Sequence, residues 1–499
     1  MPDPFDLSLL DACEQERLDR IGAIQPFGVL LGGDVGDQRI RVASADAASW
    51  LGVPGNGVLN RPLSALLPIS LGDFPAEPGQ KRILPGLVET PRGWLDAVLC
   101  NTGTEWLLEL EPLGTDDPAQ PLLSPLLGRL LRAPLSELEL EHYASALADV
   151  VRHTTQYQRT LVYRFLPDDC GEVMAESSAD PVPRYLGLRF PASDIPKIAR
   201  DLYRINHHRQ IPNVAAMPVP ILSSLPGREA DLTLSDLRAV SPVHLEYLRN
   251  MEVAGSLSFS ILVGGALWGL VACHHRTPRF LSVRVRGRCV ELTQQFALGI
   301  GSFLVNQRLD RVTGMEDRLA ALAERLPDGH PELPPMPLVG PPMLDLFKAD
   351  GVAVVDGRGV HTFGATPVES EIQGIDRWLL DQGGNQVFAT DHLAEESGLG
   401  ANPALASGVL MVPARANRPA EPGRRLYWFR PEQPHTVHWA GNPVKPMGVD
   451  PATGILSPRR SFDLWVKTTR GCSEPWNELD LMGARMLRLI LLRGGPGPV

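Results

Sequence analysis

Short runs of alternating hydrophobic and polar residues mark the N-terminal half of this 499-residue chain. FGVLLGG and RIRVAS predict two short strands, and ADAASWLG, which follows them, predicts a small helix. TLVYRF and SLSFSILVGGALWGLVACHH predict further strands, the second with a Gly-Gly hairpin turn. Because helical segments flank these strands, we expect an α+β fold in which antiparallel sheets form the centre.

The C-terminal half again predicts strands and helices, and a long helical pattern precedes them. GVAVVDGRGVHTFG predicts a hairpin around Asp356-Gly357, and LMGARMLRLILLR predicts a late helix. The long pattern has two apolar stripes: Leu292, Phe296, Ile300 and Phe303, and then Val312, Met315, Leu319, Leu322 and Leu326. About 35 residues at a rise of 1.5 Å give a rod of roughly 50 Å. We expect this rod to join two domains and to form a dimer seam.

Two stretches rich in proline and glycine, at 114–136 and 327–342, divide the chain into three domains. Charged residues make up 21% and hydrophobic residues 43%, which is typical of a globular protein. The net charge of −11 does not favour a nucleic-acid-binding surface. Six cysteines without a CxxC pair, an N-terminus without an apolar signal core and no membrane-length apolar run predict a cytoplasmic protein.

The chain contains no P-loop, GxSxG, HExxH or dinucleotide-binding glycine motif. His207-His208 and His274-His275 are adjacent pairs, and neighbouring residues point in different directions on a strand or a helix. Neither pair therefore favours a metal site, and we assign no metal ligand and no catalytic residue.

Residues 160–275 instead concentrate groups that suit a large planar ligand with acidic appendages. Arginine binds carboxylates, hydroxyls add hydrogen bonds, and aromatic walls flank a π system. Ser256, Ser258 and Ser260 alternate, so one face of a strand would carry all three. In RFPASDIPKIAR, Asp194 precedes Pro196 and a helical pattern, so Asp194 is expected to cap a helix. The other candidate residues are Tyr163, Tyr203, Tyr247, Arg209, Arg238, His244 and His274.

Five spaced motifs resemble those of the bacterial phytochromes, red-light receptors built from PAS, GAF and PHY domains. They are CEQERLDRIGAIQPFG (13–28), PASDIP (191–196), SPVHLEYLRNM (241–251), GGALWGLVACHH (264–275) and PRRSF (458–462). The resemblance covers essentially the whole chain. It implies three domains, each with a central antiparallel sheet: an N-terminal segment with PAS at 1–125, a bilin-binding GAF domain at 126–310, and a PHY domain at 311–499 with a tongue at about 425–465.

The resemblance also implies a chromophore and the residues around it. Biliverdin IX-alpha, a linear tetrapyrrole, would be attached to Cys13 through a thioether. Asp194 would offer its carbonyl to the pyrrole N–H groups and its carboxylate to Arg459 of the tongue, with Ser461 as the alternative partner. The remaining implied roles are His274 on the D-ring carbonyl, His244 in the pyrrole network, Arg209 and Arg238 on the propionates with Ser256 and Ser258 assisting, Tyr163, Tyr203 and Tyr247 around the D ring, and Ile195 in the cofactor-binding set. Ile24 would pass through a GAF loop in a figure-of-eight knot between PAS and GAF, and Phe27 replaces the family's usual histidine.

The implied function is a red/far-red photoreceptor without enzymatic turnover. Light would isomerise the chromophore at C15=C16, and the tongue and helical spine would pass the change to a C-terminal output domain beyond residue 499. The implied partners are a second copy of the chain and a response regulator or transcription regulator, with no direct nucleic-acid or membrane contact. Two alternatives remain open: a photochemically silent bilin-binding, redox-sensing or small-molecule-sensing GAF protein, and an enzyme with Cys13 as nucleophile.

Overall fold

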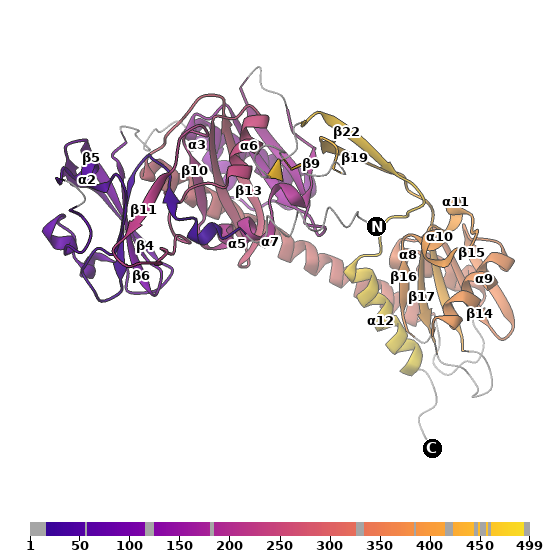
Figure 1. The fold of residues 1–499 in the computed structure, drawn as a ribbon. Helices are drawn as coiled ribbons and strands as arrows, with labels where there is room; N and C mark the ends of the chain where they lie inside the picture. The colour runs from indigo at the N-terminus through magenta and orange to yellow at the C-terminus, as the bar shows by residue number, and fades with distance from the viewer. Residues whose placement is uncertain are drawn as a thin grey trace. The chain divides into compact units, whose positions relative to one another are not determined.

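The computed structural model describes residues 16–54, 57–114, 124–179, 184–325, 334–383, 386–414, 423–443, 448–449, 456–457 and 461–493. The chain forms two compact units: one contains Met1–Phe303 with His438–Trp465, and the other contains Leu304–Val437 with Val466–Val499. A seven-stranded and an eight-stranded sheet belong mainly to the first unit, and a five-stranded sheet belongs to the second (Figure 1).

The first sheet confirms the two strands and the small helix predicted near the N-terminus. Its order is β1-β11-β3-β2-β6-β5-β4. The strands are β1 (Ala23–Ile24), β2 (Val29–Asp34), β3 (Val42–Ser44), β4 (Lys81–Thr90), β5 (Gly93–Asn101), β6 (Glu105–Pro112) and β11 (Val219–Ser223), and the helix is α2 (Ala47–Leu51). β11 comes from much later in the chain, so this sheet ties the N-terminal domain to the next one.

The N-terminal segment around Ile24 lies between two later stretches of chain. On one side Ile24 pairs with Val219, and on the other the Gln25 N–H donates to the Leu237 carbonyl at 2.7 Å. Ile24 is fully buried. This arrangement fits the predicted knot. Phe27 packs against Phe280 with ring centroids 5.7 Å apart, so an apolar contact occupies the position of the family's usual histidine.

The second sheet has the order β10-β12-β13-β7-β8-β9-β19-β22. Its strands are β7 (Arg159–Phe165), β8 (Gly171–Ser178), β9 (Arg189–Phe190), β10 (His208–Ile211), β12 (Gly255–Val263), β13 (Ala266–His275), β19 (His435–Ala440) and β22 (Leu464–Thr469). The predicted Gly-Gly turn joins β12 to β13, with φ of +58° and +79° at Gly264 and Gly265. β19 runs parallel to β9 at Trp439, so two strands from the C-terminal part of the chain extend this sheet (Figure 1).

Successive side chains of a strand point to opposite faces of the sheet, and here one face packs against the core while the other borders a cavity. Val162, Phe259 and Val271 are fully buried in a core that includes residues of α4 (Glu137–Thr155) and α7 (Val283–Ala323). Full burial of such a side chain stabilises the fold by about 1.5–3 kcal/mol. Side chains at alternate positions face the opposite side, where α5 (Lys197–Ile205) and α6 (Pro242–Asn250) contribute to a cavity.

The long helix α7 confirms the predicted rod and exceeds its expected length. It has 41 residues, or roughly 60 Å. Its first stripe, including Phe296 and Ile300, is buried in the core of the first unit, and Met315 and Leu319 are buried in the core of the second. Leu326 lies outside the described residues. Among the described helices, none is both long enough and apolar enough to cross a membrane.

The five-stranded sheet of the second unit has the order β15-β14-β18-β17-β16. Its strands are β14 (Gly351–Asp356), β15 (Gly359–Gly364), β16 (Phe388–Thr390), β17 (Gly408–Pro413) and β18 (Arg425–Arg430), and its longer helices are α8 (Met336–Phe347), α9 (Glu369–Asp381) and α12 (Glu478–Arg493). The predicted hairpin is present, with Asp356 opposite Gly359, and α12 is the predicted late helix. β18 begins where the tongue was expected to begin, yet it is an inner strand of this sheet.

Candidate functional site

A cavity of about 240 Å³ lies on the face of the eight-stranded sheet opposite its core. Residues from β7, β12 and β13 form one wall, and residues from α5 and α6 contribute to the opposite side. The predicted site residues that line it are Tyr163, Asp194, Ile195, Tyr203, Arg209, Arg238, His244, Tyr247, Ser256, Ser258 and His274. The structure therefore brings together eleven residues that the sequence could only name separately.

Most of the remaining wall is apolar. Leu161 on β7 and Leu270 and Ala272 on β13 lie at alternate positions, so their side chains share the cavity face with Tyr163 and His274. An apolar cavity with a few converging polar groups is typical of a site for a small organic ligand.

Two arginines, Arg209 and Arg238, line the cavity. The Arg209 guanidinium donates to the main-chain carbonyls of Arg238 and of Ala239, the latter at 2.8 Å. Burial, and then the charge of Arg238, lower the pKa of Arg209 to about 9. Arg238 is 8% exposed, and its Nη1 finds no hydrogen-bond partner within the described part of the chain. A buried guanidinium nitrogen without an acceptor fits a ligand that carries a carboxylate.

Tyr203 and the serines of β12 form a small hydroxyl network. The Tyr203 hydroxyl lies 2.7 Å from Ser258 Oγ, whereas Ser260 Oγ donates to the Tyr203 carbonyl at 2.7 Å. Ser256 and Ser258 line the cavity. Ser260 binds the backbone of α5 instead and thereby helps to hold Tyr203.

Two histidines face the cavity in their neutral form. Burial, and then the nearby charge of Arg209, lower the pKa of His244 to about 4. Burial, followed by Arg159 and His244, holds the pKa of His274 well below its usual value. Each ring therefore has one N–H donor and one acceptor nitrogen near neutral pH.

The expectation that Asp194 caps a helix is wrong. Asp194 ends a short 3-10 helix (Ala192–Asp194), and α5 begins only at Lys197, with Pro196 at its N-cap and no side-chain cap. The residue before a proline is disfavoured in the helical region, and Ile195 has φ of −131° and ψ of 83°. The Asp194 carboxylate instead accepts a hydrogen bond from the Tyr247 hydroxyl at 2.9 Å.

A segment from the C-terminal part of the chain reaches this cavity. Asn442 and Pro443 line it, and the Phe462 ring meets the edge of Tyr247 with centroids 5.2 Å apart. Ser461 donates to Asp463 at 2.9 Å, so this hydroxyl is bonded to another carboxylate than Asp194. Cys13 and Arg459 lie outside the described residues.

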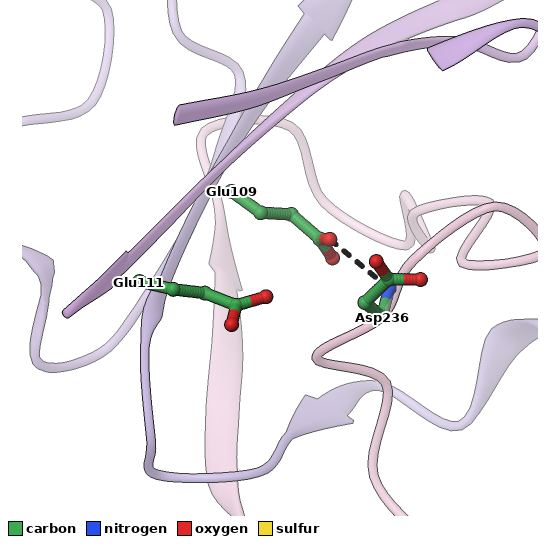
Figure 2. A group of neighbouring side chains, drawn as sticks. All are labelled: Glu109, Glu111 and Asp236. Atoms are coloured by element: carbon green, nitrogen blue, oxygen red, sulfur yellow. Dashed lines mark hydrogen bonds between the residues drawn. The ribbon is translucent and has the colours of Figure 1, made fainter. Parts of the chain in front are cut away.

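The sequence reasoning missed a buried charge network beside the cavity. Glu109 and Glu111 on β6 and Asp236 have carboxylate oxygens within 4.8 Å of one another (Figure 2). Lys81 donates to Asp236 at 2.5 Å, and Arg286 donates to both oxygens of Glu111 at 2.7 and 2.8 Å. Such a group could hold a cation, and here two protein cations already occupy that role. The signal was the run LLELEP, because a charged residue in a buried strand is normally paired.

Within this network the pKa of Glu109 is raised and the pKa of Asp236 is lowered. Burial, and then the charge of Asp236, raise the pKa of Glu109 to about 7. Burial opposes ionisation of Asp236 as well, but His208 and Lys81 outweigh it and hold its pKa well below the usual value. His208 also lines the cavity, so the network and the cavity share one wall.

Three family models match the chain in order: a PAS fold over residues 13–113, a GAF domain over 139–302 and a phytochrome region over 319–494. A bacteriophytochrome of Xanthomonas campestris is 33% identical over 98% of this chain and 78% of its own length. Cyanobacterial phytochrome A of Nostoc is 32% identical over 94% of this chain, which spans 62% of that relative.

Solved structures agree with these sequence comparisons. A bacteriophytochrome from the photosynthetic bacterium R. palustris superposes with a TM-score of 0.76 at 32% identity, covering 96% of this chain and 98% of that one. The phytochrome photosensory core module of Stigmatella aurantiaca gives 0.75 at 32% identity, covering 96% and 97%.

Proposed function

The chain belongs to the phytochrome family of red/far-red photoreceptors, and we propose that its cavity holds biliverdin attached to Cys13. One observation carries the proposal: buried Arg238 and partly buried Arg209, which form no ion pair with a carboxylate of the described residues, border a mainly apolar cavity. A bilin has a long apolar π system and two propionates, so its chemistry matches this combination. When bound, it supplies the absorption of red light and the isomerisation at C15=C16.

The attachment site is supported by where the described chain begins. Glu16 and Leu18 line the cavity, and Cys13 precedes Glu16 by three residues. Three extended residues span about 10 Å, so the Cys13 thiol can reach a ligand in the cavity.

The protein groups divide the work of holding the ligand. Arg238 and Arg209 bind its carboxylates, and Ser256 and Ser258 assist with hydroxyl hydrogen bonds. His244 and the Asp194 carbonyl face its pyrrole nitrogens. His274 hydrogen-bonds the D-ring carbonyl, with Tyr163, Tyr203 and Tyr247 around that ring and Ile195 in the surrounding wall.

Signal transmission starts at Asp194. Its carboxylate is bonded to Tyr247, and Tyr247 touches Phe462, so movement of this tyrosine reaches the segment that carries Arg459 and Ser461. We assign Arg459 as the partner that Asp194 gains or loses in one light state. Because β19 continues the sheet from β9, a change in this segment alters main-chain pairing as well. The output domain and a downstream response regulator or transcription regulator stay predictions.

Exposed leucines support a homodimer built through helices. Leu131, Leu135 and Leu138 lie before and at the start of α4, and Leu298 lies on α7; each is more than 60% exposed. α4 packs against α7 through Tyr143 and Phe296, whose rings stack 4.8 Å apart. Clustered exposed apolar side chains mark an interaction surface.

The test is assembly with biliverdin followed by a dark-minus-light absorption spectrum. We expect a covalent adduct that stays on the denatured protein and a reversible red/far-red difference spectrum. Cys13→Ala should abolish the covalent bond and retain a non-covalently bound pigment. Cys170→Ala is the matched control, because Cys170 is a free, partly exposed cysteine that should not affect attachment. A covalent adduct that persists in Cys13→Ala, or a pigment without any light-induced difference, contradicts the proposal.

A further inference from the structure

Arg159 and His274 face each other across two neighbouring strands. They are directly paired residues of β7 and β13, and one Nη2 of Arg159 lies 3.3 Å from Nδ1 of His274. Opposed residues of antiparallel strands carry their side chains on the same face of the sheet. This contact therefore follows from the strand register.

We propose that Arg159 is a positioning residue that fixes His274 in the tautomer with its proton on Nε2, so that His274 is a hydrogen-bond donor toward the ligand. A guanidinium has five N–H donors and no acceptor, so Nδ1 of His274 must accept in this contact. A neutral imidazole then carries its single proton on Nε2. The proposal deepens the proposed function, since it concerns the histidine assigned to the chromophore carbonyl.

The position of Arg159 is determined by groups outside the cavity. Its guanidinium carbon lies 4.1 Å from the centroid of the Tyr185 ring, and the Arg159 residue is 3% exposed. Glu176 accepts the N–H groups of Tyr185 and Leu186 at 2.8 and 2.9 Å and so holds the turn that carries this ring. Cation–π contact and burial together restrict the guanidinium to one place.

A second cavity explains why a fixed position of the Arg159 guanidinium matters for His274. It measures about 290 Å³, and Arg159, Tyr185 and His274 line it together with Ser461 and Asp463. His274 thus borders both cavities. Water in the second cavity can donate to Nδ1 or accept from it, so water alone would select neither tautomer. Arg159 can only donate, and this removes the ambiguity.

The neutral state of His274 is consistent with the same contact. A proton on Nδ1 would point an N–H at a guanidinium, and Arg159 and His244 contribute to the lowered pKa of His274 after burial. With the opposite tautomer, Nε2 would direct a lone pair at a ligand carbonyl oxygen, and the hydrogen bond would be lost.

The first experiment is ¹⁵N NMR of the full chain labelled at histidine and prepared without chromophore, with His274→Gln used for assignment. At pH 7.5 we expect His274 to show one protonated nitrogen, Nε2, and one unprotonated nitrogen, Nδ1. Arg159→Met should replace this pattern by a mixture or by the opposite tautomer, whereas Arg159→Lys, which keeps a donor, should retain it. Arg276→Met is the matched control, because Arg276 lines the same second cavity but has a 45% exposed side chain.

A wild-type His274 protonated on Nδ1, or an unchanged tautomer in folded Arg159→Met, overturns the proposal. The wild-type spectrum needs no variant, so misfolding of Arg159→Met leaves that test intact. It needs no pigment either, so it separates this proposal from failure of the proposed function.

The second experiment is a double-mutant cycle on the biliverdin-loaded chain. Arg159→Met should shift the absorption band and weaken the D-ring carbonyl hydrogen bond seen by resonance Raman spectroscopy. In a His274→Gln background the same substitution should have no further effect, because Arg159 acts through His274. A shift of equal size in both backgrounds would reveal a general structural role and contradict the proposal.

Discussion

Asp236 and Arg238 lie two residues apart in the chain, yet within the described segments only Asp236 and its neighbours form ion pairs, whereas Arg238 and Arg209 form none. Asp236 and Glu111 have Lys81 and Arg286 as direct partners, and the Glu109 carboxylate accepts the main-chain N–H of Asp236. Two of the three carboxylates therefore have a cationic partner, and Glu109 is held by neutral donors.

The cavity group is built in the opposite way. Arg238 is buried and Arg209 is partly buried; burial, and then the charge of Arg238, lower the pKa of Arg209. Arg209 uses main-chain carbonyls as acceptors, and Arg238 leaves Nη1 without an acceptor among the described residues. The part of the chain that the structure describes therefore supplies no ion pair to either arginine.

The difference separates charges that hold the fold from charges that await a ligand. A buried ion pair with complete hydrogen bonds is costly to break, because removal of one partner leaves the other charge uncompensated. A buried charge without a counterion already costs free energy, so its removal should relieve the empty protein and damage binding. This contrast can be tested residue by residue.

The largest effect is expected from Arg286→Met in the network around Asp236. Glu111 would stay buried without its bidentate partner, and the free energy of unfolding should fall by about 3–5 kcal/mol. Urea unfolding of the chain without chromophore measures it. Arg288→Met on the same helix is the control: Arg288 and Glu291 form an exposed pair 3.0 Å apart, which is worth about 1 kcal/mol or less. Equal losses in the two variants would break the contrast.

Arg238→Gln should leave the stability of the empty chain intact and weaken ligand binding. The stability of the empty chain should stay the same or rise, whereas reversible biliverdin affinity, measured in a Cys13→Ala background, should fall about 10- to 100-fold for a lost charged hydrogen bond of about 1.5–3 kcal/mol. Arg204→Gln is the control, because the Arg204 side chain on α5 is 52% exposed. Loss of stability in the empty chain with unchanged affinity would place Arg238 among the structural charges.

Gly171→Ala tests the shape of the cavity wall without changing any charge. A Cβ at Gly171 would overlap the ring of Tyr163, so the ring must move. We expect a loss of about 1–3 kcal/mol in unfolding free energy and an altered light-minus-dark spectrum. Gly287→Ala on α7, where a Cβ meets nothing within 4 Å, should instead stabilise the chain by up to about 1 kcal/mol. A normal spectrum in Gly171→Ala would show that the position of Tyr163 does not matter.

Local patterns predicted the elements of both regions well. The alternation in β12 and β13 and their Gly-Gly turn correspond to the observed hairpin, and the two stripes of the long helix correspond to two separate cores. Asp194 was misread because a cap depends on backbone conformation, and Ile195 before Pro196 is kept out of the helical region.

The pairing of charges could not be predicted from local patterns. Glu109 meets Asp236 across 127 positions, and Arg286 meets Glu111 across 175, so no periodicity connects them. The contact between Arg159 and His274 likewise depends on strand register. The resemblance named the residues around the ligand because it carries long-range information that a single pattern lacks.

The smallest effect is expected in the pH dependence of stability, where the two regions should differ in sign. The folded pKa of His244 is about 4 against a usual 6.5, so the stability that its neutral ring contributes is present above pH 6.5 and is lost as the pH falls toward 4. Glu109 has a folded pKa of about 7 against 4.5, so its contribution is present below pH 4.5 and is lost as the pH rises toward 7.

The comparison of wild type with His244→Gln and with Glu109→Gln isolates these contributions. Wild type should lose stability relative to His244→Gln on acidification from pH 6.5 to 4, and relative to Glu109→Gln when the pH rises from 4.5 to 7. The full shifts correspond to at most a few kcal/mol, because one pKa unit corresponds to about 1.4 kcal/mol. Hydration and relaxation around the charged forms should reduce each difference to the order of 1 kcal/mol. Urea unfolding of the empty chain across pH 4–7.5 measures both curves. If both differences change with pH in the same direction, the network and the cavity do not have opposite effects on the pH dependence of stability.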